Sequence, residues 1–431
     1  MATQPQSHLI PPTASPGQQP LRVLRLIARL NVGGPARHVA LLMAGLEPAR
    51  FAQLLVAGRV QGDEDDMGPA LREQGLDYLD LPELGRSLHP WRDLKGLCKL
   101  LGIMARFRPQ VVETHTSKAG FLGRLACMLY RPYARLRGWP VPRAIHTFHG
   151  HTFHGYFGPL LGRVFLTLER LLARLATWRV VVISPRQYQE ICQTYRVGRP
   201  QQYLVLPLGI DLAPFADPAP GRAAFRAELG LTGQDFLVGA VGRVAPVKNY
   251  GLLLAAAALL RRSHPELAAR ASWVLIGGGP PEEVAQLRDQ AERLGLAGRV
   301  RFLGSRLDPE RFMAGLDVLL LTSLNEGTPM VILEAGACGQ PVLATAVGGV
   351  PDLLGQTLEQ AQGGFQRRER GWTAASGDAN GLAAALARIM EHPREARDLG
   401  QALRDYVGSR HGRQRLLEDV ARLYEQAAGQ G

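Results

Sequence analysis

The sequence lacks several features that would assign it to a common class of protein. Its four cysteines, Cys98, Cys127, Cys192 and Cys338, are far apart and form no Cys-x-x-Cys pair, which favours neither a disulfide framework nor a zinc site. No run reaches the roughly 18 consecutive apolar residues that a membrane-spanning helix needs. The first 20 residues lack the basic start and apolar core of a signal peptide. We therefore expect a reduced, cytoplasmic protein with a disordered tail over residues 1–20.

Acidic residues are scarce in the first half of the chain. Residues 1–210 hold 26 Lys and Arg against 13 Asp and Glu, whereas the remainder holds 24 against 25. A nucleic-acid-binding protein would combine such basicity with a recognisable binding module, and none is present. We expect no nucleic-acid partner, and instead an anionic membrane surface, bound peripherally, or a phosphate-bearing acceptor.

A chain of 431 residues is too long for one ordinary core, and its pattern predicts two α/β domains. Short runs rich in Val, Ile and Leu alternate with helical patterns, as in parallel sheets covered by helices on both faces. The predicted strands are Leu21–Ala28, Gln53–Val60, Val111–Thr114, Ala144–His149, Arg179–Ile183, Phe236–Val241, Ser272–Ile276, Val300–Leu303, Val318–Leu321 and Pro341–Ala344. We place the domains at residues 21–210 and 211–412, followed by an amphipathic helix over 413–431.

The strongest motif begins at Glu326 and ends at Glu334, directly after a predicted strand. We expect it to open a helix at the carboxyl end of that strand, where open α/β sheets bind ligands. Gly327 and Thr328 leave backbone N–H groups available to an anion. The two carboxylates, eight residues apart, would lie on one helical face. The alternative is a capped helix with solvated acids, but Glu334 stands among apolar residues, where an unpaired acid is costly.

A second motif, Gly242-Arg243 with Lys248 five residues later, follows the strand Phe236–Val241. Arg grips a diphosphate as a fork and Lys attracts it as a point charge. Lys248 is one of only four lysines in the chain. An exposed basic loop without function is an equal alternative for this motif alone.

Glycine and histidine residues mark the corresponding strand ends in the first half. Gly33-Gly34 lies between the first strand and a helix, without the full Gly-x-Gly-x-x-Gly of a dinucleotide site. His149 ends a predicted strand, His115 directly follows another, and His146, His151 and His154 stand nearby. No Cys or acid has ligand-like spacing within the run from His146 to His154, so we predict packed or catalytic histidines and no metal.

Together these motifs resemble glycosyltransferase family 4, whose members have the GT-B fold. The resemblance extends from about Leu21 to the last helix and includes Leu208-Gly209-Ile210-Asp211 and Val347-Gly348-Gly349-Val350-Pro351. The pairing of Thr-Ser-Lys-Ala-Gly-Phe-Leu-Gly-Arg with His-Thr-Phe-His-Gly is similar to bacterial transferases of capsule, exopolysaccharide or lipopolysaccharide assembly. The resemblance to glycosyltransferase family 4 implies two Rossmann-like domains facing a central cleft, with the last helix crossing back onto the first domain. Two segments depart from the family pattern: 355–370, and 131–143, which we predict to be a basic loop.

The resemblance also implies residue roles. Glu326 and His149 would act at the transferred sugar, Glu334 would hold the ribose, and Arg243 with Lys248 would neutralise the diphosphate. The remaining assignments are donor binding by Gly33, Gly34, Gly242, Gly327 and Thr328, nucleobase contacts at Gly304, Arg306 and Leu307, and acceptor-side contacts at His115 and Lys118.

The resemblance implies retaining, metal-independent transfer of a hexose or N-acetylhexosamine from a nucleotide diphosphate sugar, with UDP as the expected nucleotide. The acceptor would be a glycan or polyprenyl-linked molecule of cell-surface polysaccharide synthesis, and no cofactor is expected. Arg243, Lys248 and helix N-termini can stabilise the departing diphosphate without a metal. Two alternatives remain: another GT-B enzyme, such as a nucleotide-sugar 2-epimerase, and a non-enzymatic nucleotide-sugar binder.

Overall fold

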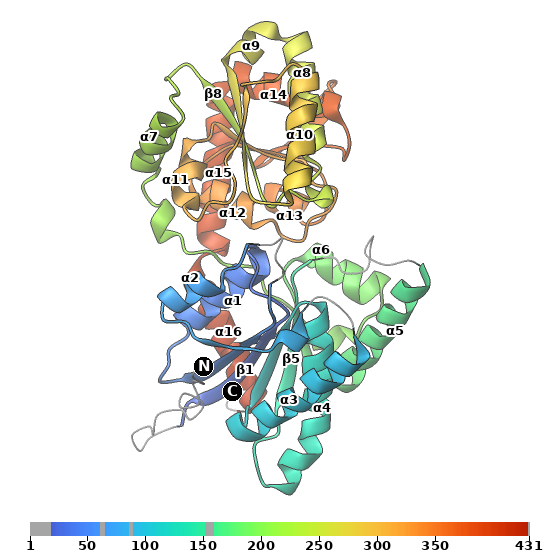
Figure 1. The fold of residues 1–431 in the computed structure, drawn as a ribbon. Coiled ribbons are helices and arrows are strands. Elements are labelled where there is room, and N and C mark those ends of the chain that lie inside the picture. Colours follow the sequence, from blue (N-terminus) through green and yellow to red (C-terminus); the bar gives the residue numbers. More distant parts are fainter. Residues whose placement is uncertain (1–18, 61–64, 86–88, 151–158, 430–431) are drawn as a thin grey trace. The chain divides into compact units, whose positions relative to one another are not determined.

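The computed structural model describes residues 19–60, 65–85, 89–150 and 159–429, without the side chains of 159–161. It divides into two compact units (Figure 1). The first holds the described residues up to Leu208, except Asp65, together with those from Gln414 onward; the second holds Gly209–Arg413 and Asp65. Most of the predicted tail, along with His151 and His154, lies outside the described residues.

The first unit is built on a seven-stranded sheet in the order β3-β2-β1-β4-β5-β6-β7. Every neighbouring pair of strands is parallel. The strands are β1 (Leu21–Ile27), β2 (Phe51–Ala57), β3 (Tyr78–Asp80), β4 (Val111–His115), β5 (Arg143–Phe148), β6 (Thr177–Val182) and β7 (Tyr203–Val205). The helices of this unit are α1 (Gly34–Gly45), α2 (Gly68–Glu73), α3 (Pro90–Phe107), α4 (Ser117–Leu136), α5 (Pro159–Leu175), α6 (Pro185–Tyr188) and α16 (Arg413–Ala428).

The two faces of this sheet are covered by different helices. Leu24 and Leu26 of β1 pack with α3 and α4, whereas Leu21 and Val23 pack with α1 and α16. Since successive side chains of a strand point to opposite faces, Arg25 lies on the α1 and α16 side. The last helix therefore packs onto the sheet of the first unit, as the resemblance implied.

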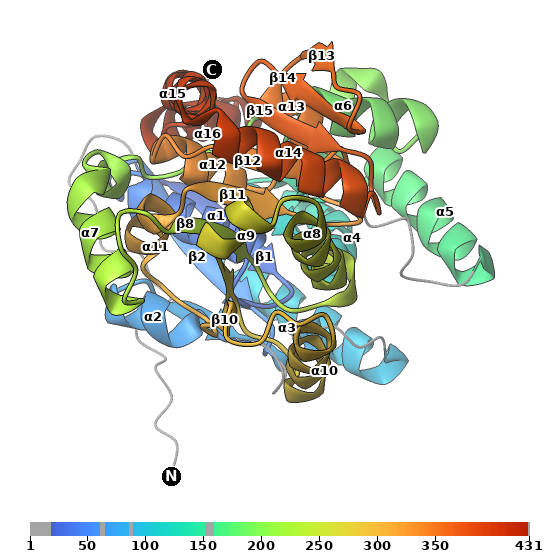
Figure 2. The ribbon, with the colours of Figure 1, turned by 90° about the horizontal axis from the view of Figure 1, so that it is seen from above.

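The second unit contains an eight-stranded sheet in the order β10-β9-β8-β11-β12-β15-β14-β13. Its strands are β8 (Phe236–Val241), β9 (Ala271–Ile276), β10 (Val300–Phe302), β11 (Val318–Leu321), β12 (Val342–Thr345), β13 (Thr357–Gln360), β14 (Phe365–Arg368) and β15 (Gly371–Ala374). Its helices are α7 (Pro218–Glu228), α8 (Tyr250–Ser263), α9 (Pro265–Arg270), α10 (Pro281–Arg293), α11 (Pro309–Gly315), α12 (Met330–Ala337), α13 (Val350–Leu354), α14 (Ala379–Glu391) and α15 (Pro393–Arg410). In both views α7 lies beside α11 (Figures 1 and 2).

Two segments differ from the sequence-based expectation. The predicted basic loop over 131–143 is wrong in its first part, because α4 continues to Leu136 despite Pro132 within it. Tyr130 and Ala134 are buried on either side of the proline, so packing outweighs its cost in the helix. The segment 355–370, which we could not assign, forms the antiparallel hairpin of β13 and β14 at the edge of the second sheet (Figure 2).

Candidate active site

Each sheet contains a switch point, where two neighbouring parallel strands are followed by connections that run in opposite directions along the sheet. In the first sheet this point lies between β1 and β4, and in the second between β8 and β11. Loops that leave the carboxyl ends of such neighbouring strands diverge, and open α/β sheets bind ligands in the resulting crevice. His115 and the Gly33-Gly34 loop lie beside the switch point of the first sheet, and Arg243, Lys248 and Glu326 lie in the loops beside that of the second.

In the first unit, two histidines and a glycine loop meet the carboxyl edge of the sheet. His115 is the last residue of β4, and His149 directly follows β5. Gly33 is the N-cap of α1 and Gly34 its first residue, so the loop after β1 presents the amino end of a helix. A third histidine, His38, is buried within α1.

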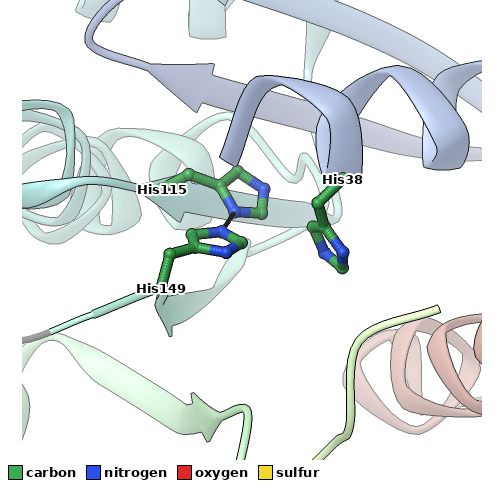
Figure 3. A group of neighbouring side chains, drawn as sticks. All are labelled: His38, His115 and His149. Atoms are coloured by element: carbon green, nitrogen blue, oxygen red, sulfur yellow. Dashed lines mark hydrogen bonds between the residues drawn. The ribbon is translucent and has the colours of Figure 1, made fainter. Parts of the chain in front are cut away.

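His38, His115 and His149 form a compact cluster (Figure 3). Nδ1 of His115 lies 2.9 Å from Nε2 of His149. The ring of His38 is centred 5.0 Å from that of His149 and 5.7 Å from that of His115. Within the described part of the chain, these three side chains are the one group whose nitrogen atoms converge closely enough to hold a metal ion.

Burial keeps two of these rings neutral. Desolvation, followed by the neighbouring His115, lowers the pKa of His38 to about 3. Desolvation, followed by His38 and His115, holds the pKa of His149 well below its ordinary value of 6.5. Neutral imidazoles are hydrogen-bond acceptors as well as donors, so the cluster can accept a hydrogen bond from a hydroxyl group.

A buried network of Arg25, Glu113 and Tyr424 lies next to His115 of the histidine cluster. Oε2 of Glu113 on β4 accepts a hydrogen bond from Nε of Arg25 on β1 over 2.8 Å. The hydroxyl of Tyr424, from α16, accepts from Arg25 and donates to the same Glu113 oxygen. Burial alone would raise the pKa of Glu113, but His115, Arg25 and the hydrogen bonds hold it well below its ordinary range. Glu113 is therefore an ionised carboxylate beside His115.

His146 belongs to the other face of the sheet. It lies on β5, and its Nδ1 is 2.8 Å from Oγ1 of Thr114. Gly120 packs directly against its ring, where an added Cβ would lie 2.4 Å from Cε1. His146 is thus a packed core histidine, separate from the cluster on the α1 and α16 side.

In the second unit, the loop after β8 holds the predicted phosphate-binding residues. Gly242 has a φ of 143°, a conformation that favours glycine, and the hydroxyl of Tyr250 donates to its carbonyl oxygen over 2.7 Å. Arg243 follows with an exposed side chain. Lys248 ends a short 3-10 turn, and its Nζ donates to Oε1 of Glu326 over 2.6 Å.

Glu326 lies in the loop after β11, the strand beside β8. Its Oε1 also accepts a hydrogen bond from Oγ of Ser323 over 2.6 Å. Lys248 and Glu326 are both partly buried, with 21% and 11% of their side chains exposed. The two strongest sequence motifs therefore meet across the switch point of the second sheet.

The position of Glu326 corrects one expectation. We predicted that Glu326 and Glu334 share one face of a helix, but α12 begins only at Met330. Glu326 precedes the helix, and Glu334 is buried inside it with 4% of its surface exposed. Thr328, also buried, lies in the loop, and its Oγ1 has no hydrogen-bond partner among the described residues. The two acids thus belong to two environments, one in the loop and one in the helix.

Close backbone contacts fix the loop that carries Glu326. A Cβ at Gly348, whose φ is 51°, would lie 1.6 Å from the carbonyl oxygen of Glu326. The N–H of Gly349 donates to the carbonyl oxygen of Gly327 over 2.8 Å. The glycine pair after β12 is therefore required for the packing of the Glu326–Gly327 backbone, a role that the sequence motif did not reveal.

Two predicted site residues are held by ion pairs of their own unit. Nζ of Lys118 lies 2.7 Å from Oδ1 of Asp93 on α3. The guanidinium of Arg306 binds Asp308 and Glu228. Gly304 and Leu307 beside it are exposed at the carboxyl end of β10. The assignments of Lys118 to the acceptor side, and of Gly304, Arg306 and Leu307 to the nucleobase, stay predictions.

Sequence reasoning missed three residues of the first site: His38, Glu113 and Tyr424. Glu113 could have been found, because an acid inside an apolar strand, two residues before His115, lies on the same face as that histidine. His38 comes four residues after Gly34, one helical turn from the glycine loop. Tyr424 lies more than 300 residues from Glu113, and no local pattern connects them.

The structure thus contains two doubly wound units. The first holds the histidine cluster, which can accept hydrogen bonds, and the second holds the Lys248–Glu326 pair beside the turn at Gly242. Within the described residues, no helix is both long and apolar enough to cross a membrane.

The fold agrees with solved structures at under 25% identity. Anabaena HepE in complex with UDP and glucose matches with a TM-score of 0.75 and 20% identity over 94% of this chain and all of that one. WaaG, a glycosyltransferase involved in lipopolysaccharide biosynthesis, matches with a TM-score of 0.68 and 18% identity over 93% and 99%.

Sequence comparison identifies the family. A model described as Glycosyl transferase 4-like domain matches residues 33–209, and one described as Glycosyl transferases group 1 matches 221–406. The chain is 31% identical over 324 residues to the UDP-Gal:alpha-D-GlcNAc-diphosphoundecaprenol alpha-1,3-galactosyltransferase of Escherichia coli, covering 72% of this chain and 79% of that protein. It is 34% identical over 227 residues to the D-inositol 3-phosphate glycosyltransferase of Kineococcus radiotolerans, about half of each protein.

The fold is therefore that of a GT-B glycosyltransferase, which confirms the predicted fold class. The chain belongs to glycosyltransferase family 4.

Proposed function

We propose that this glycosyltransferase moves a hexose or N-acetylhexosamine from a UDP sugar to a polyprenyl-linked or glycan acceptor, with retention of configuration and without a metal. The observation that carries the proposal is the contact between Lys248 and Glu326 at the switch point of the second sheet. A cation for the diphosphate and a carboxylate for sugar hydroxyls then stand side by side where such folds bind ligands.

The basic residues account for departure of the diphosphate. Lys248 and the exposed Arg243 supply positive charge at the carboxyl end of β8, beside Gly242. Charge that is already in place stabilises the developing diphosphate without reorganisation. This argument supports a metal-independent reaction.

Glu326 and Glu334 would bind different parts of the donor. Glu326, held by Lys248 and Ser323, would bind hydroxyls of the transferred sugar together with the Gly327 and Thr328 backbone. Glu334, buried in α12, would bind the ribose. We assign His149 to the transferred sugar and the Gly33-Gly34 loop to the phosphates. Retention would follow from attack on the face that the diphosphate leaves, with the phosphate taking the acceptor proton.

The names of relatives favour the donor and acceptor. The Escherichia coli relative is named for UDP-galactose and for a diphosphoundecaprenol-linked sugar, and it shares 31% identity. A lipid-linked acceptor also agrees with the excess of basic residues in the first half of the chain. Both observations favour a role in cell-surface polysaccharide synthesis.

Peripheral attachment to an anionic membrane is part of this proposal, with α5 as the contacting element. Val164, Leu171 and Leu175 are 48%, 52% and 60% exposed, an unusual exposure for apolar side chains on one helix. Arg163 and Arg174 beside them are exposed as well. Apolar side chains flanked by arginines suit a headgroup boundary. Arg131, in contrast, donates to the carbonyl oxygens of Pro142 and Ala176, so it does not belong to this surface.

The experiment is incubation with a panel of nucleotide sugars, with and without a polyprenyl-diphosphate-linked sugar, followed by mass spectrometry. Transfer gives an acceptor one sugar heavier, and only with the acceptor present. Release or isomerisation of the donor sugar without acceptor would favour the epimerase alternative, and unchanged nucleotide sugars would favour a binding protein.

A further inference from the structure

The contact between His115 and His149 raises the question of which ring donates. Their facing atoms, Nδ1 of His115 and Nε2 of His149, are 2.9 Å apart, so one nitrogen must carry the proton and the other must accept it (Figure 3). A neutral histidine has one protonated nitrogen, and the partner of the other nitrogen decides which. The far side of each ring therefore settles the question.

On its far side His115 faces an ionised carboxylate. Nε2 of His115 lies 3.3 Å from Oε2 of Glu113, which is long for a hydrogen bond but close for an electrostatic contact. Arg25 and Tyr424 already donate to this oxygen, and both Arg25 and Glu113 are fully or almost fully buried. A carboxylate only accepts, so the proton of a neutral His115 belongs on Nε2.

The position of the proton on His115 determines the tautomer of His149. With the proton on Nε2, His115 Nδ1 is an acceptor, and His149 must donate through Nε2. Nδ1 of His149 is then unprotonated; this atom is buried and has no hydrogen-bond partner among the described residues. It can accept a hydrogen bond from a ligand hydroxyl but cannot donate one.

We propose that Glu113 and His115 are positioning residues that fix the tautomer of His149, so that its Nδ1 accepts a hydrogen bond from a sugar hydroxyl of the substrate. The proposal rests on the proposed function only for the identity of that ligand; the tautomer itself is a property of the first unit alone. A metal ion in the cluster is the competing explanation. A metal ion bound by both neutral rings would leave no single proton shared by the facing nitrogens, so it would break the contact between His115 and His149.

The direct test is a long-range ¹H–¹⁵N spectrum of the full chain labelled with ¹⁵N-histidine, because the two ring-nitrogen shifts distinguish the neutral tautomers and the cation. Signals are assigned from the spectra of H115N and H149N. We expect the proton between the two rings to lie on Nε2 of His149 and the proton of His115 to lie on its Nε2. A proton on Nδ1 of His149, or a cationic His115, would overturn the proposal even if the enzyme is active.

Two variants separate positioning from packing. H115F keeps a ring but offers no acceptor, so it should alter the His149 signals and lower kcat by at least about tenfold, with a smaller change in KM. H115N places an oxygen near the position of Nδ1 and should restore part of that loss. The control H146N removes a contact on the other face of the sheet and should leave the His149 signals unchanged. Normal kcat in folded H115F would overturn the positioning role.

Metal content is measured on the same samples. We expect no stoichiometric metal after purification without chelator, and no change of the three histidine signals on addition of Zn²⁺ at equal concentration. Stoichiometric zinc, lost in H115F, would overturn the tautomer proposal in favour of a metal site. If no nucleotide sugar is used by the wild type, the spectra still test the tautomer, so failure of the proposed function is distinguishable.

Discussion

Nζ of Lys248 lies 2.6 Å from Oε1 of Glu326, although 78 residues separate them in the sequence. The pair joins the loop after β8 to the loop after β11, the two strands that flank the switch point of the second sheet. A bound diphosphate would compete with Glu326 for Lys248. The contact therefore makes the two residues interdependent, and their substitutions should not be additive.

Removal of the lysine should weaken binding of the free nucleoside diphosphate. We expect K248A and R243A each to lose about 1–3 kcal/mol of binding free energy, the scale of a charge-assisted contact. The loss should be larger for K248A, because Glu326 is then left near the phosphates without its cation. Isothermal titration calorimetry with UDP measures both losses.

The double variant K248A/E326Q gives the coupling. Since the second change removes the repulsive carboxylate, it should recover part of the affinity lost in K248A. R262A, at the exposed end of α8, is a matched control that should bind as the wild type does. Unchanged affinity in both K248A and R243A would remove the phosphate-binding assignment.

The two glutamates should affect different kinetic constants. Glu326 lies in the loop beside Lys248, so E326A should chiefly lower kcat if its contacts strengthen in the transition state. Glu334 is buried in α12, so E334Q should keep the shape of the helix and raise the apparent donor constant. Steady-state kinetics with varied donor distinguish these effects. Normal kinetics in both variants, combined with lower melting temperatures, would show a structural role.

The buried histidines should make the first unit sensitive to acid. Burial lowers the pKa of His38 to about 3 and holds the pKa values of His146 and His149 well below 6.5. Below pH 6.5 the unfolded chain therefore binds more protons than the folded chain, and stability falls as the pH falls. Each ring contributes up to about 1.4 kcal/mol per pH unit while this difference lasts.

Glu113 adds to this loss at lower pH. Its pKa is depressed in the folded state, so its contribution is complete above about pH 4.5 and disappears as the pH falls through the folded value. Hydrogen exchange of peptides from β1, β4 and β5 between pH 7.5 and 5.5, corrected for intrinsic rates, measures the first effect. H38N should give a shallower dependence, and a pH-independent opening free energy in the wild type would contradict the account.

Sequence patterns predicted the fold well where hydrophobic periodicity alone decides it. The strands Phe236–Val241 and Val318–Leu321 agree with the structure at both ends, and the predicted last helix begins at Arg413 as in the structure. The short strands β3 and β7 were missed because three residues give too little pattern. The hairpin of β13 and β14 was missed because its strands are largely polar, as suits the edge of a sheet.

The candidate site was only partly predictable. Residues at strand ends, such as His115, His149 and Glu326, were found because the carboxyl edge of a parallel sheet binds ligands. Tyr424 could not be found, because its contact with Glu113 depends on how the last helix crosses the first sheet. The position of Glu326 relative to α12 was wrong because Pro329 delays the start of the helix to Met330.

Membrane attachment should depend on α5. In sedimentation with vesicles, the protein should bind when anionic lipid is present and should dissociate as salt rises, because each basic residue contributes about 1 kcal/mol near an anionic surface. R163S/R174S and L171S/L175S should both reduce binding. R261S/R262S on α8 is the control with the same charge change. Equal recovery in the supernatant with anionic and neutral vesicles at low salt would contradict attachment.

The most direct measurement of the central claim is the anomeric configuration of the transferred sugar. The enzyme is incubated in EDTA with a ¹³C-labelled UDP-hexose and a polyprenyl-diphosphate-linked sugar, and the product is analysed by NMR. The account predicts a glycoside with the same anomeric configuration as the donor, formed at a rate that EDTA leaves largely unchanged. An inverted product, or activity that EDTA abolishes and Mn²⁺ restores, would contradict it.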